Sequence, residues 1–256
     1  MVGFYTAIRS RGLLVSLLAS MMWMNGNGMT QLSALAQPAW EVSVNFPKAS
    51  GNSGSPRQTT GAGNRNGTCT IRKDSQPGMT AIMPVGNIGT TVAANPSLSI
   101  YIPQTNAKRL EVVIAEVAFA EEEFKEVYVK SDFVIPVALK EDPGIITLKL
   151  DGANLEPNKL YKWTFTAFCG DANDFSKAEK VWGLFEPKEL SADLRRQLEG
   201  ATPLEQAKLY AQAGIWNETL ALVSSLRASN PREWTELLHS IDLNNLDSAP
   251  LLESNP

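Results

Sequence analysis

The sequence predicts an α+β protein in which an antiparallel β-sandwich is followed by a C-terminal bundle of three to four α-helices. Between residues 68 and 187, short stretches alternate apolar and polar residues, with turn residues roughly every 8 to 12 positions, which is typical of a sandwich. After Pro187 the apolar residues instead follow the spacing of amphipathic helices. We therefore expect a sandwich domain at 68–187. A helical extension at 188–256 should pack on it and end in a frayed tail.

The clearest strand lies within 155–169. Tyr161, Trp163 and Phe165 are two residues apart and share one face, whereas Lys162 and Thr164 point the other way, as in a half-buried antiparallel strand. Further strands are predicted at 80–84, 98–102, 110–114, 124–129, 134–139, 145–150 and 180–186, with turns at 86–91 and 130–132 and a hairpin tip at 121–123.

A short phrase before this strand refines the fold class. Leu155, Pro157 and Tyr161 resemble the sheet-to-sheet corner of immunoglobulin-like sandwiches, where the tyrosine hydroxyl bonds to the backbone just upstream. We therefore expect an immunoglobulin-like sandwich. The same phrase predicts that Tyr161 and Trp163 belong to the core.

Capping signals and apolar spacing predict three of the helices. Thr202, Pro203 and Glu205 supply an N-cap hydroxyl, a first-turn proline and an acid three residues after the cap, and this helix should end at Gly214. Two further helices carry apolar stripes made of Trp216, Leu220, Val223 and Leu226, and of Trp234, Leu237, Leu238 and Ile241.

This helical region resembles one tetratricopeptide-type helix pair. The residues that carry the resemblance are Ala207, Tyr210, Gly214, Trp216, Thr219, Asn230 and Pro231. The pattern departs from that family at Pro203, where an aromatic residue is expected, and at Thr219, where alanine is usual. A solenoid needs about three such units. A single unit is therefore expected to pack on the sandwich.

The first 36 residues have the order of a secretory signal peptide. Arg9 and Arg11 precede an apolar run at 13–24, and Ala34 and Ala36 form a small-residue cleavage site before Gln37. The run of 12 residues is shorter than the roughly 20 that a membrane-spanning helix needs. We expect cleavage between Ala36 and Gln37, with an uncleaved anchor or a disordered N-terminus as the alternatives. A flexible lead-in is predicted at 37–67, since 48–67 has no aliphatic residue larger than alanine.

Charge excludes two classes of partner. Without the leader the chain has 21 Lys and Arg against 27 Asp and Glu, a net charge of −6. Nucleic acids and anionic lipids need a concentrated basic face. We therefore expect no nucleic acid partner and no anionic lipid partner. The predicted leader indicates a periplasmic or extracellular location, with no stable membrane insertion after cleavage.

Cys69 and Cys169 are the chain's two cysteines, and both follow the predicted leader. An even pair in an oxidising compartment predicts a disulfide. Two buried free thiols are the alternative.

Little in the sequence points to reaction chemistry. His239 is the single histidine, so a zinc site or a catalytic triad would have to be built around it alone. We expect no catalytic residue, no cofactor and no metal site. Asp171, Asn173 and Asp174 offer oxygen ligands for calcium, but Asx-turns between two strands are the favoured interpretation.

The order and spacing of motifs over nearly the whole exported part resemble a cyanobacterial domain-of-unknown-function family, number 928. The residues that carry the resemblance are Cys69, Pro96, Tyr101, Pro103, Pro143, Gly144, Ile145, Leu155, Pro157, Tyr161, Trp163, Cys169, Asp171, Asp174, Ser176, Leu209, Tyr210, Ala211, Ile215, Trp216, Trp234, Leu237 and Leu238. The chain departs from the family at Pro187, where arginine is expected. It also departs in the segment before Cys69, which is less rich in glycine and arginine than the family pattern. The resemblance implies export and a β-rich body, and no activity.

The leading functional hypothesis is a non-catalytic envelope protein that presents a surface to another envelope protein. Its interaction candidates are Tyr210, Trp216 and Trp234, which would otherwise join the helices to the sheet. The runner-up is a carbohydrate-binding module or a weak glycan-active enzyme. Exposure of Tyr101, Tyr128 or Trp182 on a sheet face would favour the runner-up.

Overall fold

The computed structural model describes residues 43–47, 69–70, 77–120, 123–135, 142–170 and 178–252. All of them lie in the compact unit that runs from Val42 to Pro256. The predicted leader, its cleavage site, the candidate calcium ligands and the last residues of the tail fall outside these ranges. Among the described helices, none is long and apolar enough to cross a bilayer.

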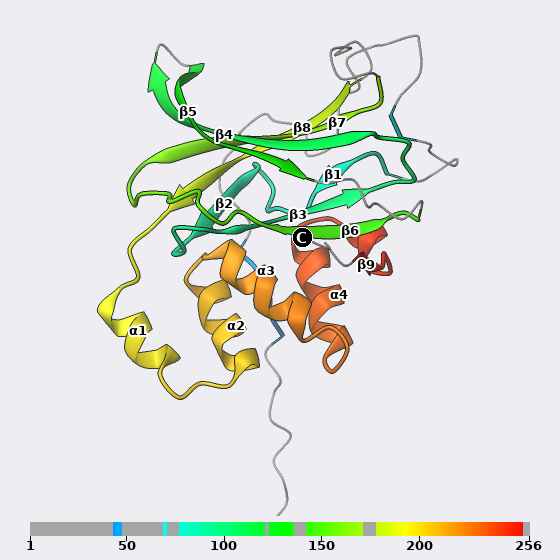
Figure 1. The fold of residues 1–256 in the computed structure, drawn as a ribbon. Helices are drawn as coiled ribbons and strands as arrows, with labels where there is room; N and C mark the ends of the chain where they lie inside the picture. Colours follow the sequence, from blue (N-terminus) through cyan, green and yellow to red (C-terminus); the bar gives the residue numbers. More distant parts are fainter. Residues whose placement is uncertain are drawn as a thin grey trace, which may run out of the picture. The chain divides into compact units, whose positions relative to one another are not determined.

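The described residues form two mixed sheets and four helices, so the fold is α+β (Figure 1). One sheet has the strand order β2-β8-β7-β4-β5, with bounds β2 Ile88–Thr91, β4 Arg109–Ala120, β5 Glu123–Ile135, β7 Leu160–Phe168 and β8 Ala178–Pro187. The other has the order β1-β3-β6-β9, with bounds β1 Thr80–Ala81, β3 Ser97–Ile102, β6 Gly144–Lys149 and β9 Leu251–Leu252. The helices are α1 Ala192–Leu198, α2 Pro203–Gln212, α3 Trp216–Ser225 and α4 Pro231–Ser240, followed by the short 3-10 helix η2 Asn244–Leu246.

The prediction of purely antiparallel sheets is wrong at two edges. Strand β2 runs parallel to β8, and β9 runs parallel to β6. The segment 86–91, predicted as a turn, contains β2. These strands have two to four residues and gain their hydrogen bonds from a neighbour distant in sequence, so local alternation gives little sign of them.

The predicted turn at 130–132 is also wrong, because β5 continues through it. In the pairing of β4 with β5, Ile114 faces Ser131 and Ala115 faces Val129, so Lys130 is an extra residue in the ladder. A bulge of this kind bends a strand without ending it.

The first core fills the space between the two sheets. Tyr161, Trp163 and Phe165 of β7 are fully buried there and share the core with Leu98 and Ile100 of β3. A Cβ at Gly183 of β8 would lie 2.6 Å from the Trp163 ring. The indole therefore occupies the space that a side chain at 183 would need.

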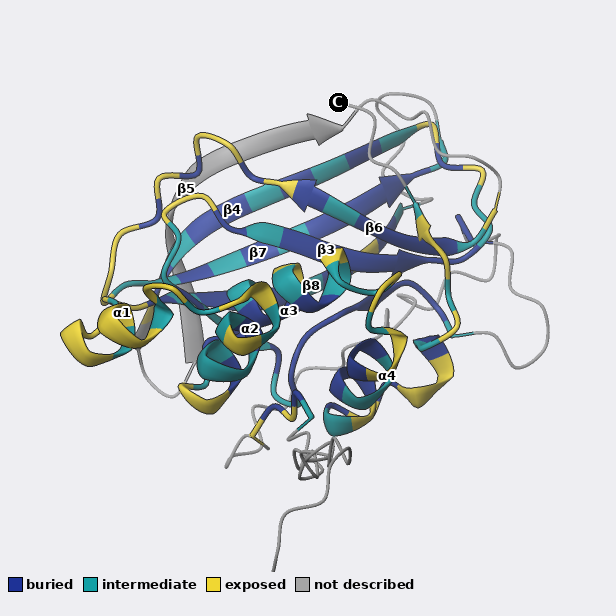
Figure 2. Ribbon diagram, turned by 90° about the horizontal axis from the view of Figure 1, so that it is seen from below, coloured by how far each residue is buried: buried dark blue, intermediate teal, exposed yellow. Residues whose placement is uncertain are grey.

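A second core lies on the other face of the four-stranded sheet. Tyr101 of β3 and Ile145 of β6 pack in one cluster with Trp216 of α3 and with Trp234 and Leu238 of α4. The small sheet is thus a middle layer with the helices on its far side, and Figure 2 shows its buried residues in dark blue beside them.

Residues 43–47 correct the predicted lead-in, because they pack against the helices. Val44 is fully buried, and its N–H donates to the Glu233 carboxylate at 2.6 Å. Phe46 meets the Trp216 ring edge-on, with 4.9 Å between ring centroids, and its N–H donates to Ser240 Oγ at 3.2 Å. The alternation of Val44 and Phe46 with polar residues was the missed sequence signal. We call residues 43–47 the N-terminal arm.

The predicted disulfide is present and joins Cys69 to Cys169, 100 positions apart in sequence. Next to it, the backbone N–H and the hydroxyl of Thr70 donate to the buried Glu179 carboxylate of β8 at 2.8–3.2 Å. The carbonyl of Cys69 accepts from the Thr105 hydroxyl at 2.9 Å. These contacts attach the segment around Cys69 to both β8 and the loop before β4.

The disulfide should contribute strongly to stability. We expect Cys69→Ser and Cys169→Ser each to lower the free energy of unfolding by about 2–5 kcal/mol, because the bond restricts a long loop of the unfolded chain. Urea unfolding of the oxidised protein, the reduced protein and both variants measures this. Equal midpoints for the oxidised and reduced forms would contradict it.

The arm should also stabilise the helical layer. We expect Phe46→Ala to cost about 3 kcal/mol, because it removes a buried aromatic ring from the second core. Asn45→Ala, at the exposed neighbouring position, should cost less than about 0.5 kcal/mol. Thermal unfolding gives the two stabilities, and the tryptophan fluorescence of the folded protein should change in the Phe46 variant alone, because Phe46 packs on Trp216. Similar losses in both variants would argue against a packed arm.

Candidate functional site

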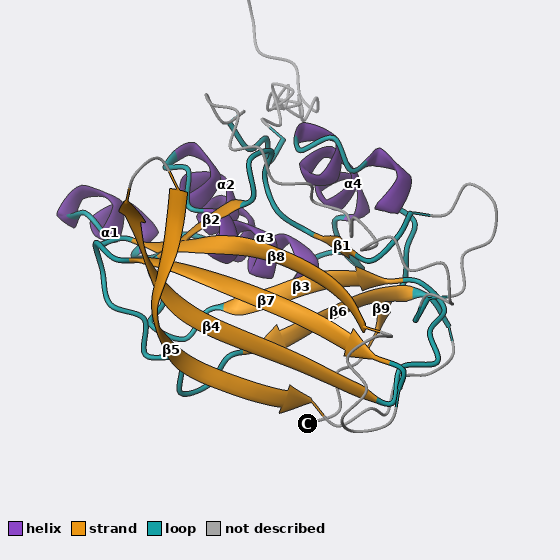
Figure 3. Ribbon diagram, turned by 90° about the horizontal axis from the view of Figure 1, so that it is seen from above, coloured by secondary structure: helices purple, strands orange, loops and turns teal. Residues whose placement is uncertain are grey.

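The helices leave the outer face of the five-stranded sheet open. Figure 1 places every helix on the side of the four-stranded sheet, and Figure 3, from the opposite side, shows β8, β7 and β4 with no helix in front of them. Alternation along these strands directs Trp163 and Val181 into the core, so Thr164 and Trp182 face outward. Val113, Thr164 and Trp182 form one row across β4, β7 and β8.

Trp182 is half-buried in this face and has a lysine on each side. The Lys162 ammonium lies 5.4 Å from the centroid of the Trp182 ring, within cation–π range. Lys180 is exposed two residues before Trp182, on the same face of β8. We call Lys162, Thr164, Lys180 and Trp182 the Trp182 surface.

Two acidic groups among the described side chains of this face are paired near its ends. Glu111 of β4 pairs with Arg109 at 3.0 Å, and Arg109 also stacks on Phe168 at 4.1 Å. At the other end, Glu186 pairs with Lys188 at 3.4 Å. Lys162 and Lys180 thus lie next to Trp182, and the strand register places Asp132 of β5 in the same row as Val113, Thr164 and Trp182.

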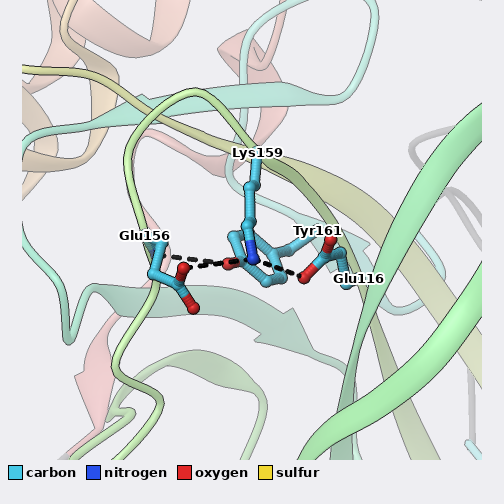
Figure 4. Close-up of polar contacts among 4 residues, drawn as sticks. All are labelled: Glu116, Glu156, Lys159 and Tyr161. Atoms are coloured by element: carbon cyan, nitrogen blue, oxygen red, sulfur yellow. Dashed lines mark hydrogen bonds and ion pairs between the residues drawn. The ribbon is translucent and has the colours of Figure 1, made fainter.

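A second charged cluster lies at the corner before β7 (Figure 4). The Lys159 ammonium contacts carboxylate oxygens of Glu156 at 3.1 Å and Glu116 at 3.2 Å. The backbone N–H of Glu156 donates to the hydroxyl of the buried Tyr161 at 3.2 Å. This is the bond to the upstream backbone that the Leu155–Pro157–Tyr161 phrase predicts.

The corner cluster has the chemistry of a structural ion pair. Hydrogen bonds to Glu156 and then to Glu116 hold the pKa of Lys159 above its ordinary value. The amine therefore stays protonated at neutral pH and has no lone pair for nucleophilic or base chemistry. Beside it lies an open cleft of about 660 Å³, lined by residues 158–160 and 186–189.

A cleft of about 490 Å³ lies where α1 meets α2, with Glu199, Glu205 and Lys208 in its lining. The Glu205 carboxylate accepts from the backbone N–H and the hydroxyl of Thr202, both at 2.8 Å, in the predicted capping box. These hydrogen bonds lower the pKa of Glu205. The carboxylate is therefore used to begin α2.

Two of the three helical interaction candidates are buried. Trp216 and Trp234 are 0% and 1% exposed, and their indole N–H groups donate to the carbonyls of Ile82 at 3.1 Å and Asp247 at 2.9 Å. Tyr210 is half-buried, and burial, with a smaller effect of Glu218, raises its pKa. Trp216 and Trp234 thus join the helices to the sheet and to the C-terminal segment, leaving no indole surface for a partner.

The remaining candidates give no reaction centre in the described part. His239 is exposed on α4 and lies 3.3 Å from the Asp247 carboxylate. Both cysteines of the chain are in the disulfide. Within the described ranges, no group of three or more His, Cys, Asp or Glu side chains is placed to hold a metal ion.

The prediction from sequence identified Trp182 only as an aromatic residue whose exposure would favour glycan binding. It did not single out Lys162 or Lys180. Of the other two aromatics named with it, Tyr101 is buried in the second core, and the side chain of Tyr128 lies outside the described part. The missed signal was the register. Antiparallel pairing of Thr164 with Trp182 places Lys162 and Lys180 beside the ring.

The corner ion pair should make stability depend on alkaline pH. A lysine whose pKa is raised by folding stabilises the fold below its unfolded-state pKa of about 10.4, and this contribution is lost as pH rises through the higher folded-state value. We therefore expect Lys159→Met to lower the melting temperature at pH 8, with the difference from wild type narrowing above about pH 10.4.

Melting curves of both proteins from pH 8 to pH 12 measure this difference. Lys149→Met, at an exposed position of β6, controls for the general effect of alkali on lysine variants. A Lys159→Met deficit that stays constant across this range would contradict the structural role of the ion pair.

Comparison with known proteins places the chain in a family. No curated protein and no solved structure matches it. The sequence model of the family described as Domain of Unknown Function (DUF928) matches residues 60–251 of the 256-residue chain. The match takes in both cysteines, the strands of the five-stranded sheet and the four helices, and the N-terminal arm precedes it. The chain therefore belongs to the DUF928 family.

Proposed function

We propose that this chain is an exported cell-envelope protein that acts by binding another envelope component rather than by catalysis, and that it binds through the outer face of the five-stranded sheet. One observation carries the proposal. The helices and the four-stranded sheet bury their apolar residues against each other, whereas the outer sheet face keeps a half-exposed tryptophan in contact with Lys162. Tryptophan is enriched at interfaces relative to the rest of a protein surface.

Export is supported by two independent features. The leader-like order of residues 1–36 predicts secretion, and the Cys69–Cys169 disulfide fits an oxidising compartment. The proposed location is periplasmic or extracellular, after cleavage between Ala36 and Gln37. Because the family that the chain resembles is cyanobacterial, the proposed location is the envelope of a cyanobacterium.

A binding role is supported by how the reactive side chains are used. Lys159 is paired with two carboxylates, Cys69 and Cys169 are joined to each other, and the Glu205 carboxylate caps α2. Each of these groups has a structural partner that a catalytic role would require it to leave.

Two finer features of the architecture also belong to the proposal. The Glu156–Tyr161 hydrogen bond supports an immunoglobulin-like relation for the sandwich. The passage from α2 to α3 at Gly214, which has φ of +68°, supports a tetratricopeptide-type helix pair. Such a pair would here serve as a structural layer, since its tryptophans are buried.

The proposal predicts which face meets a partner in the envelope. A photo-crosslinking residue at position 164, on the outer sheet face, should give an adduct of higher mass in intact cells. The same residue at position 208, on α2, should not. Denaturing electrophoresis of the envelope fraction detects both outcomes. Adducts from position 208 alone, or from neither position, would contradict binding through the outer sheet face.

A further inference from the structure

We infer that the helical layer carries a peptide-binding groove, and that the N-terminal arm occupies it as a tethered competitor of a partner protein. The partner segment that fits is extended and has an aliphatic residue two positions before an aromatic one, as Val44 and Phe46 are spaced in the arm. The groove is formed by Trp216 of α3 and by Glu233 and Ser240 of α4, and we call it the arm groove. The helices lie on the side of the four-stranded sheet, away from the outer sheet face, so this inference goes beyond the proposed function (Figure 1).

The arm is held in the way that an extended peptide ligand is held. Val44 and Phe46 are buried, whereas the residue after each of them is exposed, which is the alternation of an extended strand. The backbone N–H groups of Val44 and Phe46 both donate to side chains of α4, to Glu233 at 2.6 Å and to Ser240 at 3.2 Å. The groove therefore bonds the backbone at alternate residues and buries a side chain at the same two positions, as peptide-binding sites for extended segments do.

The Glu233 carboxylate explains why the groove needs an occupant with a free backbone N–H. Glu233 is only 6% exposed, and its carboxylate accepts from the Val44 N–H. A buried carboxylate needs hydrogen-bond donors to offset its lost hydration. An empty groove would remove this donor, and a proline at the Val44 position could not supply one. The favoured states are therefore the one with the arm bound and one with a matching segment in its place.

The arm groove and the arm belong to different parts of the chain. Trp216, Glu233 and Ser240 lie within residues 60–251, which match the family model, whereas the arm precedes the match. The segment 48–68, whose composition predicts flexibility, joins the arm to the disulfide at Cys69. The groove is thus part of the sequence common to the family, and the arm is an attached occupant.

The tether determines which partner competes with the arm. A short flexible tether gives an effective concentration of about 1 mM, so a free segment with the same contacts displaces the arm only near that concentration. The arm of a second copy makes only the same contacts, so exchange between copies gains nothing over the closed chain. A different protein that adds contacts outside the groove displaces the arm at lower concentration. The fitting occupant is therefore a segment of another protein.

The test uses the full mature chain, residues 37–256, with a fluorescent peptide of residues 41–48 as the probe. Wild type should bind the peptide weakly, because its own arm fills the groove. Phe46→Ser should release the arm and bind the peptide about tenfold more tightly. Asn45→Ser, at the exposed position between the two anchors, is the matched control and should bind as wild type does. Fluorescence anisotropy measures the affinities, and the peptide should also raise the melting temperature of Phe46→Ser more than that of wild type.

Two further changes identify the contacts. A peptide with Val44→Pro should bind the Phe46→Ser chain about tenfold more weakly, because proline has no N–H for Glu233. In the Phe46→Ser chain, Glu233→Gln should weaken peptide binding about fivefold, because it removes the charge from the accepting group. Thr164→Ala, on the outer sheet face, should leave peptide binding unchanged, so failure of this inference stays distinguishable from failure of the proposed function.

Three results would overturn the inference. The first is a folded Phe46→Ser chain that binds the peptide no better than wild type does. The second is equal binding of the Val44→Pro peptide, which would place the peptide outside the arm groove. The third is a wild-type dimer in sedimentation at micromolar concentration that Phe46→Ser abolishes, since the occupant would then be the arm of a second copy.

Melting curves establish whether the Phe46→Ser chain is folded. If it is not, wild type at millimolar peptide decides the question, because the free peptide then competes with the arm. A photoreactive group at position 45 of the peptide should label residues 216–240 of the chain. Labelling elsewhere, or none, would contradict the arm groove.

Discussion

The four-stranded sheet must keep both of its faces out of water, and the rest of the structure follows from this constraint. Leu98 and Ile100 face the larger sheet, whereas Ile82, Tyr101 and Ile145 face the helices. Exposing the three residues of the second face would cost about 5–9 kcal/mol. That is comparable to the whole net stability of a domain, which is about 5–15 kcal/mol. The helical layer is therefore an integral part of this fold.

Both ends of the described chain reinforce the same layer. The N-terminal arm adds Val44 and Phe46 to the second core. Near the C-terminus, Arg227 donates to the carbonyls of Ala249 at 2.6 Å and Asp247 at 2.9 Å, and its guanidinium stacks on Trp234 at 4.9 Å. These contacts of Arg227 hold the C-terminal segment in place just before β9, which pairs with β6. The helix tryptophans Trp216 and Trp234 make their contacts within this layer. A buried indole needs both apolar surroundings and a partner for its N–H.

Function is consequently expected where structural demands are lowest. The corner lysine has two carboxylate partners, and the disulfide occupies the far end of the sandwich. The outer face of the five-stranded sheet is different. Its inward-facing residues fill the core. The alternate positions face outward, so their side chains are not constrained by core packing. Trp182 lies at such a position, outside the two cores, which is why we propose that this surface is used for recognition.

The sequence alone determined the features that depend on residues close together along the chain. Three features are local requirements of strands, helices and turns, so they could be read directly from the sequence. They are the two-residue period around Trp163, the capping box from Thr202 to Glu205, and the sheet-to-sheet corner at Tyr161. The cysteine pair followed from composition and expected compartment. The short parallel strand β2, the packing of the arm and the burial of Trp216 were decided by tertiary structure. Each of these features depends on residues far away in the chain. The exposure of Trp182 does too, because the helices pack on the four-stranded sheet and leave the outer face of the five-stranded sheet uncovered.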